Sequence, residues 1–322
     1  MAAIIEWRRR ARMFQRFVFC DRHVFTLARN NASLSSKPPA VHLQNDQEHC
    51  LQLVRTRDYE GFLCSLLLPP ESRRSSIAVR AFNVELAQIK DLVSQKTMGL
   101  VRMQFWKNAL EEIFKDDPPH QPVAMELWRA IKKHRLTKGW FSRIINTREE
   151  DLNDRAYRNI QELETYADNT QSSLLYLLLE TQGVKDIHAD HAASHIGKAQ
   201  GIITCLRAVP YHSSKRNVYL PMDICMLHGI SQEDIMRRSQ EKPVRDVIYD
   251  IACQAHVHLQ HARSFSEKIP PAAVPAFLQT VAVEDYLCRI RKADFNVFHP
   301  SLQKRNPLLP LHLYISSWRR KY

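Results

Sequence analysis

Scarcity of glycine is the strongest constraint on the fold of this chain. Only 7 of the 322 residues are glycine, about 2%, whereas roughly 7% is usual in proteins. Rossmann folds and β-sandwiches need many more glycines for their tight turns. The sequence also contains no alternating strand pattern of useful length and no internal repeat. We therefore predict an all-α protein.

Apolar residues recur at helical spacing from about Gln47 onward. One long helix is expected to end before the Asp-Asp-Pro-Pro run at residues 116–119, because proline cannot continue a helix. Three helices are marked by Met98, Val101, Phe105, Ala109 and Phe114, by Ile160, Leu163, Ala167, Thr170, Leu174 and Leu177, and by Phe277, Val281 and Ile290. The longest apolar runs, such as residues 174–179, are far shorter than the roughly 20 residues of a membrane span. We predict a soluble or peripheral protein.

The net charge of +12 is concentrated at the N-terminus. Residues 1–37 contain eight arginine or lysine residues and two acidic ones, so they hold half of the net charge. The rest of the chain has an ordinary balance of charges for its length. We therefore predict no nucleic-acid partner, although the total charge alone would suggest one.

The N-terminal segment interleaves its arginines with apolar residues such as Trp7, Phe14 and Phe17, and ends in serines and prolines. An arginine-rich, acid-poor amphipathic segment is typical of a mitochondrial transit peptide. We predict that residues 1–45 are a mitochondrial transit peptide and linker, and that residues 46–322 form a single large helical domain. A disordered basic arm is the alternative.

Seven cysteines are scattered along the chain without a CxxC pair. Their odd number and their spacing fit neither a disulfide framework nor a zinc site. A reducing compartment is expected, and the mitochondrial matrix would provide one.

A segment from Leu68 to Asp91 reads LPPESRRSSIAVRAFNVELAQIKD. It resembles, without a gap, the first diphosphate-binding motif of the squalene and phytoene synthase family, approximately LPxxxRxAxxALYAFCRxxDDxxD. The matching residues are Pro69, Arg73, Ala78, Ala81 and Phe82. The first two aspartates of the motif fall on Ala87 and Gln88, and only the last, Asp91, is retained.

A second segment, residues 196–221, reads IGKAQGIITCLRAVPYHSSKRNVYLP. It resembles the second motif of the same family, LGxALQLTNILRDVxEDxxxGRxYLP. The matching residues are Gly197, Ala199, Leu206, Arg207, Val209, Tyr219, Leu220 and Pro221. The two metal-binding aspartates of this motif fall on Ala208 and His212. Weaker similarity around residues 166–175 and 276–298 extends the resemblance to about residues 48–318.

The resemblance implies an all-α fold of the squalene/phytoene synthase (isoprenoid synthase) type, with roughly ten helices around one central cavity. Enzymes of this family hold Mg²⁺ ions between carboxylates on facing helices and the substrate diphosphate. Four of the five metal positions lack a carboxylate here, and Glu85 is the candidate substitute. We predict a vestigial site without metal or other cofactor, made of Ala87, Gln88, Asp91, Arg207, Ala208 and His212.

Cationic and phenolic side chains remain near both motifs. Arg73, Arg80 and Arg207 are expected to make the cavity mouth less acidic than in an enzyme. One hypothesis is that they attract an anionic head group. Tyr166 and Tyr219 are further candidates for cavity contacts.

Two rows of histidines have helical spacing: His188, His191 and His195 in one, and His256, His258 and His261 in the other. Such rows could bind zinc. Histidines on a single helix are more often solvated or partnered locally, and we favour that interpretation.

Aromatic residues allow two interpretations. The pairs Phe105-Trp106 and Trp140-Phe141 could line a tunnel for a prenyl chain, but a plain core role is favoured. The C-terminal residues 318–322, WRRKY, place an aromatic residue beside three cations, which suits a membrane interface. An ordinary frayed terminus explains them equally well.

Within the family, the segments FNVELAQIKDLVS and RMQFWKNAL resemble most a branch of mitochondrial complex I assembly factors that is regarded as non-catalytic. This resemblance implies a pseudoenzyme that acts early on a membrane-arm subunit, with complex I subunits or assembly intermediates as partners. It also implies a peripheral position on the matrix side of the inner membrane. The alternatives are an isoprenoid- or lipid-binding protein and an active prenyl transferase.

Overall fold

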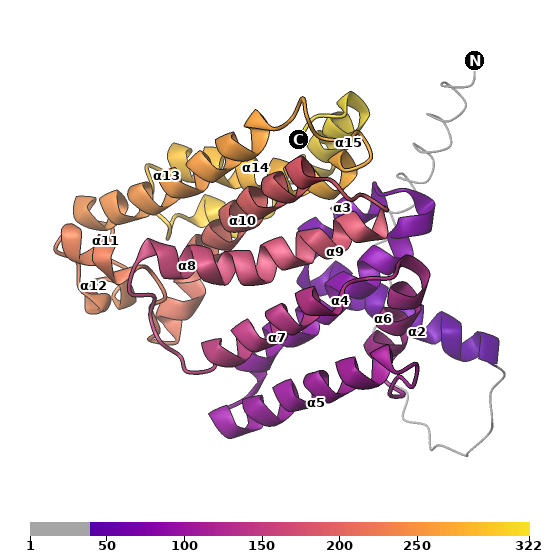
Figure 1. Cartoon of the computed structure of the whole chain (residues 1–322). Coiled ribbons are helices and arrows are strands. Elements are labelled where there is room, and N and C mark those ends of the chain that lie inside the picture. Colours follow the sequence, from indigo (N-terminus) through magenta and orange to yellow (C-terminus); the bar gives the residue numbers. More distant parts are fainter. Residues whose placement is uncertain (1–38) are drawn as a thin grey trace, which may run out of the picture. The chain divides into compact units, whose positions relative to one another are not determined.

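Helices make up the regular structure, and no β-strand occurs, in residues 39–322, the part of the chain that the computed structural model describes (Figure 1). This confirms the all-α prediction. The α-helices are α2 (Pro39–Arg57), α3 (Tyr59–Leu66), α4 (Pro70–Leu92), α5 (Lys96–Phe114), α6 (Pro122–His134), α7 (Lys138–Asp151), α8 (Ile160–Ala167), α9 (Ser173–Thr181), α10 (Ile187–Ser214), α11 (Met222–Leu227), α12 (Gln232–Met236), α13 (Lys242–Ser264), α14 (Gln279–Lys292) and α15 (Leu309–Arg319). Three further segments are a π-helix, η1 (Asp168–Ser172), and two 3₁₀-helices, η2 (Val274–Leu278) and η3 (Pro300–Gln303).

Residues 1–38 of the predicted transit peptide lie outside the described part of the chain. Helix α2 begins at Pro39, ahead of the predicted boundary between residues 45 and 46. Residues 39–322 form one unit by their internal contacts.

The expectation of roughly ten helices was too low, since residues 39–322 contain 14 α-helices. Short helices explain the difference: α11 and α12 have 6 and 5 residues, too few to leave a periodic pattern in the sequence. The long helix expected over residues 160–177 is present as α8 and α9, joined through the π-helical η1.

Prolines and side-chain caps set the helix boundaries. Proline occupies the first turn of α4, α6 and α13, where its missing N–H costs no hydrogen bond. Asp58 caps α3 by accepting from the amide of Gly61, and Asp186 caps α10 by accepting from the amide of Ala189. Helix α5 ends at Phe114, before the Asp-Asp-Pro-Pro run, as predicted.

The exposed face of α5 differs from the one that the sequence pattern suggested. Met98, Val101 and Phe105 are 53%, 63% and 44% exposed, whereas Met103 and Trp106 are buried. Both sides of this helix are apolar, so helical spacing alone cannot select the buried side. Packing against α6 and α7 selects it.

Two of the four aromatic residues in the pairs belong to the core, as favoured. Trp106 and Phe141 are buried and meet the ring of Phe82 edge-on, with centroids 5.3 and 5.4 Å apart. Phe105 is partly exposed, and Trp140 packs against the ring of Tyr176. None of the four lines the central cavity.

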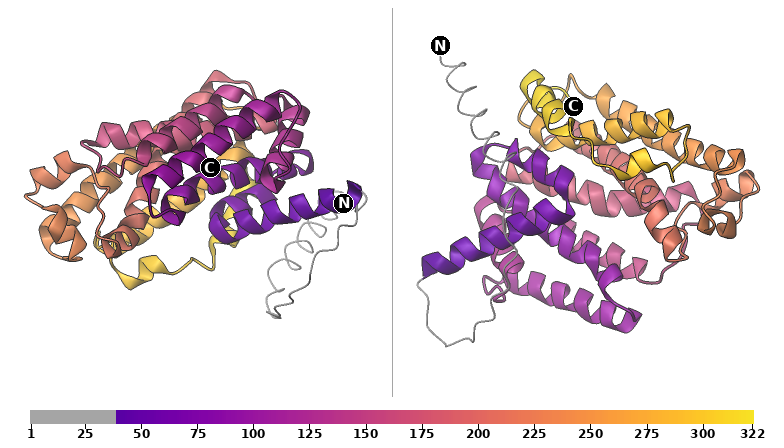
Figure 2. Two further views of the ribbon diagram at one scale, coloured as in Figure 1. Left: turned by 90° about the horizontal axis from the view of Figure 1, so that it is seen from below. Right: turned by 180° about the vertical axis from the view of Figure 1, so that it is seen from behind.

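Helix α10, the longest at 28 residues, lies between α13 on one side and α8 with η1 on the other (Figures 1 and 2). Two glycines permit its close approach to η1 and α8. A Cβ on Gly197 would lie 2.4 Å from the backbone nitrogen of Ser172, and one on Gly201 would lie 2.9 Å from the Cα of Ala167. Real Cβ atoms do not approach backbone so closely, so both positions require glycine.

None of the helices described between residues 39 and 322 is both long enough and apolar enough to cross a membrane.

We predict that Gly197→Ala lowers the free energy of unfolding by about 1–3 kcal/mol, because the added methyl group overpacks the contact with Ser172. Gly139→Ala is the matched control. A Cβ at Gly139, in the first turn of α7, meets its nearest atom at 3.9 Å, so this change should stabilise by up to about 1 kcal/mol through helix propensity. Urea unfolding measures both values. Equal stability of Gly197→Ala and the unchanged protein would contradict the close approach.

Candidate functional site

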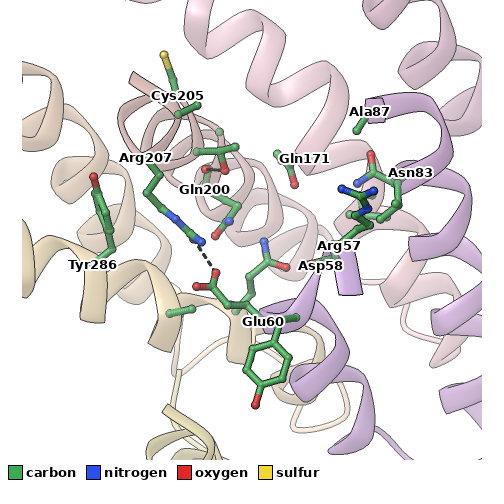
Figure 3. A pocket seen from close by; sticks show the side chains of 18 of the residues that line it. Arg57, Asp58, Glu60, Asn83, Ala87, Gln171, Gln200, Cys205, Arg207 and Tyr286 are labelled. Carbon is green, nitrogen blue, oxygen red and sulfur yellow. Dashed lines mark hydrogen bonds and ion pairs between the residues drawn. The ribbon is translucent and has the colours of Figure 1, made fainter. Parts of the chain in front are cut away.

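A cavity of about 640 Å³ opens between helices α4 and α10. Residues from α3, α7, α8, η1, α14 and the segment leading into α15 also line it, together with single residues of α2, α5, α9 and α15. Figure 3 shows polar side chains from several of these elements converging on the same space, among them Asn83, Gln171, Gln200 and Arg207. The two motif segments of the sequence therefore face one common cavity.

Eight of the ten residues predicted for the site line this cavity. They are Arg80, Ala87, Asp91, Tyr166, Arg207, Ala208, His212 and Tyr219. The other two are not among its lining residues. Gln88 donates from Nε2 to the carbonyl of Val84 at 3.3 Å, and Arg73 donates to the carbonyl of Leu68 at 3.2 Å. Arg73 and Gln88 thus bond to backbone carbonyls outside the cavity lining.

The retained carboxylate, Asp91, is already engaged by protein donors. It accepts from the hydroxyl of Tyr211 at 3.0 Å and from Nζ of Lys215 at 3.3 Å. Ala87 and Ala208 have no side-chain atom that can bind a metal. Glu85 does not line the cavity, and burial raises the pKa of its carboxyl.

His212 cannot replace the missing aspartate as a charge. Burial lowers the pKa of its imidazole although Asp91 acts in the opposite direction, so the ring is neutral near pH 7. Within residues 39–322, no group of three or more His, Cys, Asp or Glu side chains is placed to hold a metal ion. Magnesium needs several oxygen ligands, and the side chains at this site do not fit it.

A lysine stands beside the retained aspartate. Nζ of Lys90 lies 3.2 Å from a carboxylate oxygen of Asp151 and 3.1 Å from one of Asp154. The ammonium also lies 4.2 Å from the ring centroid of Tyr219. Burial opposes the charge, but Asp151 and Asp154 hold the pKa of Lys90 above its usual range. A positive charge therefore occupies a wall where the related motif has aspartates.

Most other charges on the cavity wall are paired. Nη1 of Arg207 lies 2.8 Å from Oε2 of Glu60 (Figure 3). Nη1 of Arg80 lies 3.0 Å from Oδ2 of Asp58, and Nη2 of Arg80 donates to Oε1 of Gln279 at 3.1 Å. These pairs connect α3 with α10 and α4.

Arg148 of α7 is different, because its guanidinium contacts neutral groups. It donates to Oδ1 of Asn83 at 2.9 Å and lies 3.5 Å from the hydroxyl of Tyr166. No carboxylate of the described residues lies within ion-pair distance of it. Its Nε and Oε1 of Gln200 are buried without a hydrogen-bond partner. These are polar groups that a ligand in the cavity would satisfy.

Sequence reasoning missed Lys90 and Arg148. Lys90 could have been found, because it is a cation inside a motif that should be acidic. Arg148 carried no such signal, since it lies on a helix outside both motifs and reaches the cavity only through the fold.

A profile of the squalene/phytoene synthase family matches residues 54–311. The chain belongs to the squalene/phytoene synthase family. Two relatives, both called NADH dehydrogenase (ubiquinone) complex I, assembly factor 6, come from Bos taurus and Homo sapiens. Each is 69% identical over 274 residues, which cover 85% of this chain and 82% of the relative.

Solved structures show the same fold at much lower sequence identity. A dehydrosqualene synthase crystallised with a ligand is 16% identical and superposes with a TM-score of 0.76, covering 88% of this chain and 98% of the enzyme. The squalene/phytoene synthase fold is therefore retained here.

The two histidine rows meet at His195, which contacts His258 and His261. His195 of α10 lies 3.0 Å, Nδ1 to Nδ1, from His258 of α13, and Nε2 of His258 lies 3.1 Å from Glu164. The ring of Phe265 stacks against those of His188, His191 and His195. These histidines therefore have local partners, as favoured, although Nδ1 of His188 and Nε2 of His258 are buried without a hydrogen-bond partner.

We predict that His195 makes the protein less stable in acid. Burial, followed by the charges of His258, His261, Lys198 and His191, lowers the pKa of His195 to about 4 from 6.5. The unfolded chain binds this proton first, so the contribution of His195 is complete above about pH 6.5 and is lost as the pH falls toward about 4. Glu164, which faces His258, is the opposing charge in this cluster.

Melting temperatures across this pH window test the prediction. The Tm of His195→Gln should fall less than that of the unchanged protein as the pH is lowered. His256→Gln, at an exposed position of α13, is the control and should follow the unchanged protein. Parallel pH profiles of the unchanged protein and His195→Gln would contradict the prediction.

Proposed function

We propose that this protein is a non-catalytic assembly factor for mitochondrial respiratory complex I. The observation that carries the proposal is the 69% identity, over 85% of the chain, to relatives called complex I assembly factor 6. A 41% identical relative from Drosophila melanogaster is called a homolog of the same factor. Its partners are then complex I subunits or assembly intermediates.

The finer placement follows from the N-terminal sequence and the family branch. The arginine-rich residues 1–45 serve as the mitochondrial transit peptide. The protein then acts early, on a membrane-arm subunit, as a peripheral protein on the matrix side of the inner membrane.

The absence of catalysis is argued from the cavity wall. Mg²⁺ must be held by carboxylates to bind and activate a diphosphate leaving group. Here two of those positions are alanines, one is a neutral histidine, and Asp91 is bound to Lys215 and Tyr211. The cationic Lys90 would further oppose a metal ion.

We predict that the purified protein does not convert farnesyl or geranylgeranyl diphosphate in the presence of Mg²⁺. The physical reason is the lack of carboxylates for the ion. Product analysis by chromatography, with a no-enzyme blank and a chelator-treated sample, makes the measurement. Product above the blank that disappears with chelator would disprove the pseudoenzyme proposal.

A second candidate function is the binding of an isoprenoid or other lipid with an anionic head. The specific observation in its favour is the pair of buried, unpartnered polar atoms, Nε of Arg148 and Oε1 of Gln200, on the wall of a 640 Å³ cavity. A cavity of this volume lies in the usual range for small-molecule sites.

In cells, removal of the protein should lower the amount of assembled complex I and leave complexes II and IV near normal, because a dedicated factor serves one client. Asp91→Ala should restore complex I fully, since a lone carboxylate held by Lys215 carries no chemistry. Native gel electrophoresis of mitochondria makes the measurement. Normal complex I without the protein would refute the proposed function.

Arg148→Gln distinguishes the two candidates. Full rescue by this variant supports a scaffold that uses no ligand. Failure to rescue at normal protein abundance, while Asp91→Ala rescues, supports the ligand-binding function of the cavity.

A further inference from the structure

Helix α15 exposes a row of apolar side chains along one of its sides. Its inner side is buried through Leu309 and Leu313, at 4% and 0% exposure. Its outer side carries Leu311 and Trp318, which are 51% and 76% exposed, and Leu308, the residue just before the helix, is 55% exposed. Together with Ile315, these residues are spaced by three, four and three positions, so they lie along one side of the helix. A surface helix usually presents polar residues there.

The charges around this row have one sign. From residue 295 to the C-terminus the chain contains no aspartate or glutamate, and it contains five lysine or arginine residues. All five are exposed: Lys304, Arg305, Arg319, Arg320 and Lys321. They lie at both ends of α15, so cations flank the apolar row.

Neighbouring acids do not neutralise these cations. Helix α14, on which α15 packs (Figure 1), carries Glu284 and Asp285. Glu284 pairs with Arg263, and Asp285 pairs with Arg289. The surface formed by the outer side of α15 and its five flanking cations, here called the α15 face, is therefore both apolar and cationic.

We propose that the α15 face binds the surface of an anionic lipid membrane. An amphipathic helix lies in the membrane interface with its apolar side in the acyl boundary and basic residues near the phosphates. Tryptophan is enriched at this depth, and each basic residue near an anionic surface adds to the affinity. The α15 face combines Trp318, two leucines and five cations in this arrangement.

Charge opposes two other occupants that the chain itself could supply, the α15 face of a second copy and the N-terminal segment. A second copy would bring a second α15 face of the same sign. The N-terminal residues 1–37 hold eight basic and two acidic residues, so they would be repelled as well. The occupant must be anionic, and the exposed leucine and tryptophan side chains favour lipid over a purely polar anion.

This inference rests on the peripheral membrane position proposed above and assigns it to particular residues. The two can fail separately. Removal of the protein could lower complex I while the purified protein fails to bind vesicles. This result would refute membrane binding by the α15 face and would leave the assembly function in place.

The first test is sedimentation of the full-length protein with phosphatidylcholine vesicles, with and without phosphatidylglycerol. Binding should be strong only with the anionic lipid. The triple variant Arg319→Gln, Arg320→Gln, Lys321→Gln should bind roughly 100-fold more weakly, about fivefold for each cation. The double variant Leu311→Ser, Trp318→Ser should bind at least about tenfold more weakly, because two apolar side chains no longer insert.

The matched control is Met226→Ser, Leu227→Ser. These residues are 74% and 77% exposed, but the acidic Asp223, Glu233 and Asp234 lie close to them in the sequence. Binding of this control should equal that of the unchanged protein. Every variant keeps residues 1–37, so binding by that basic segment is common to all, and differences report on α15. Equal binding by all variants would overturn the proposal.

The second test locates the contact. Vesicles with brominated acyl chains quench tryptophans that reach the hydrocarbon boundary. They should quench the fluorescence of the unchanged protein, and Trp318→Phe should lose that quenching while its far-UV circular dichroism stays the same. Equal quenching in both proteins would place the contact elsewhere and overturn the proposal. Strong retention of the unchanged protein by an acidic polypeptide, with no binding to vesicles, would also overturn it, in favour of a protein partner.

Discussion

The close packing of α10 against α8 and η1 is the contact on which the cavity depends. Gly197 and Gly201 leave no room for a Cβ beside Ser172 and Ala167. This contact fixes the side of α10 that carries Arg207, Ala208 and His212, and it turns that side toward α4. The π-helical turn of η1 belongs to the same contact, and π-turns inside helices often accompany functional sites. The helices that enclose the cavity therefore keep the arrangement of the squalene/phytoene synthase fold.

Charged side chains on the cavity wall are mostly paired with one another. In the related motifs, carboxylates on facing helices would hold a metal ion. Here Asp91 is neutralised by Lys215, and Lys90 is held charged by Asp151 and Asp154. The wall is stabilised by ion pairs within the protein rather than prepared for a cation. Leu302, Lys304, Arg305 and Leu309 belong to the same wall, so an α15 face on a membrane would bring one side of the cavity close to the lipid.

Sequence patterns predicted the site better than they predicted the faces of helices. Motif register brought eight of ten site residues to one cavity, because a gapless motif on each of two helices fixes the spacing along both. The apolar face of α5 was misjudged at Met98 and Phe105, since both sides of that helix are apolar. Gln88 and Arg73 do not line the cavity, because Gln88 bonds along its own helix and Arg73 bonds to the carbonyl of Leu68, just before α4 begins.

The sequence by itself determined the all-α class, the helix ends at prolines and caps, the family, and the lack of carboxylates at residues 87, 88, 208 and 212. These are local properties, or properties of chain register, that need no knowledge of packing. Tertiary structure alone decided that Arg148 reaches the cavity from α7, that His195 meets His258, and that the apolar side of α15 stays uncovered. Each of these depends on which distant helices lie side by side, and a single sequence does not encode that in any local pattern.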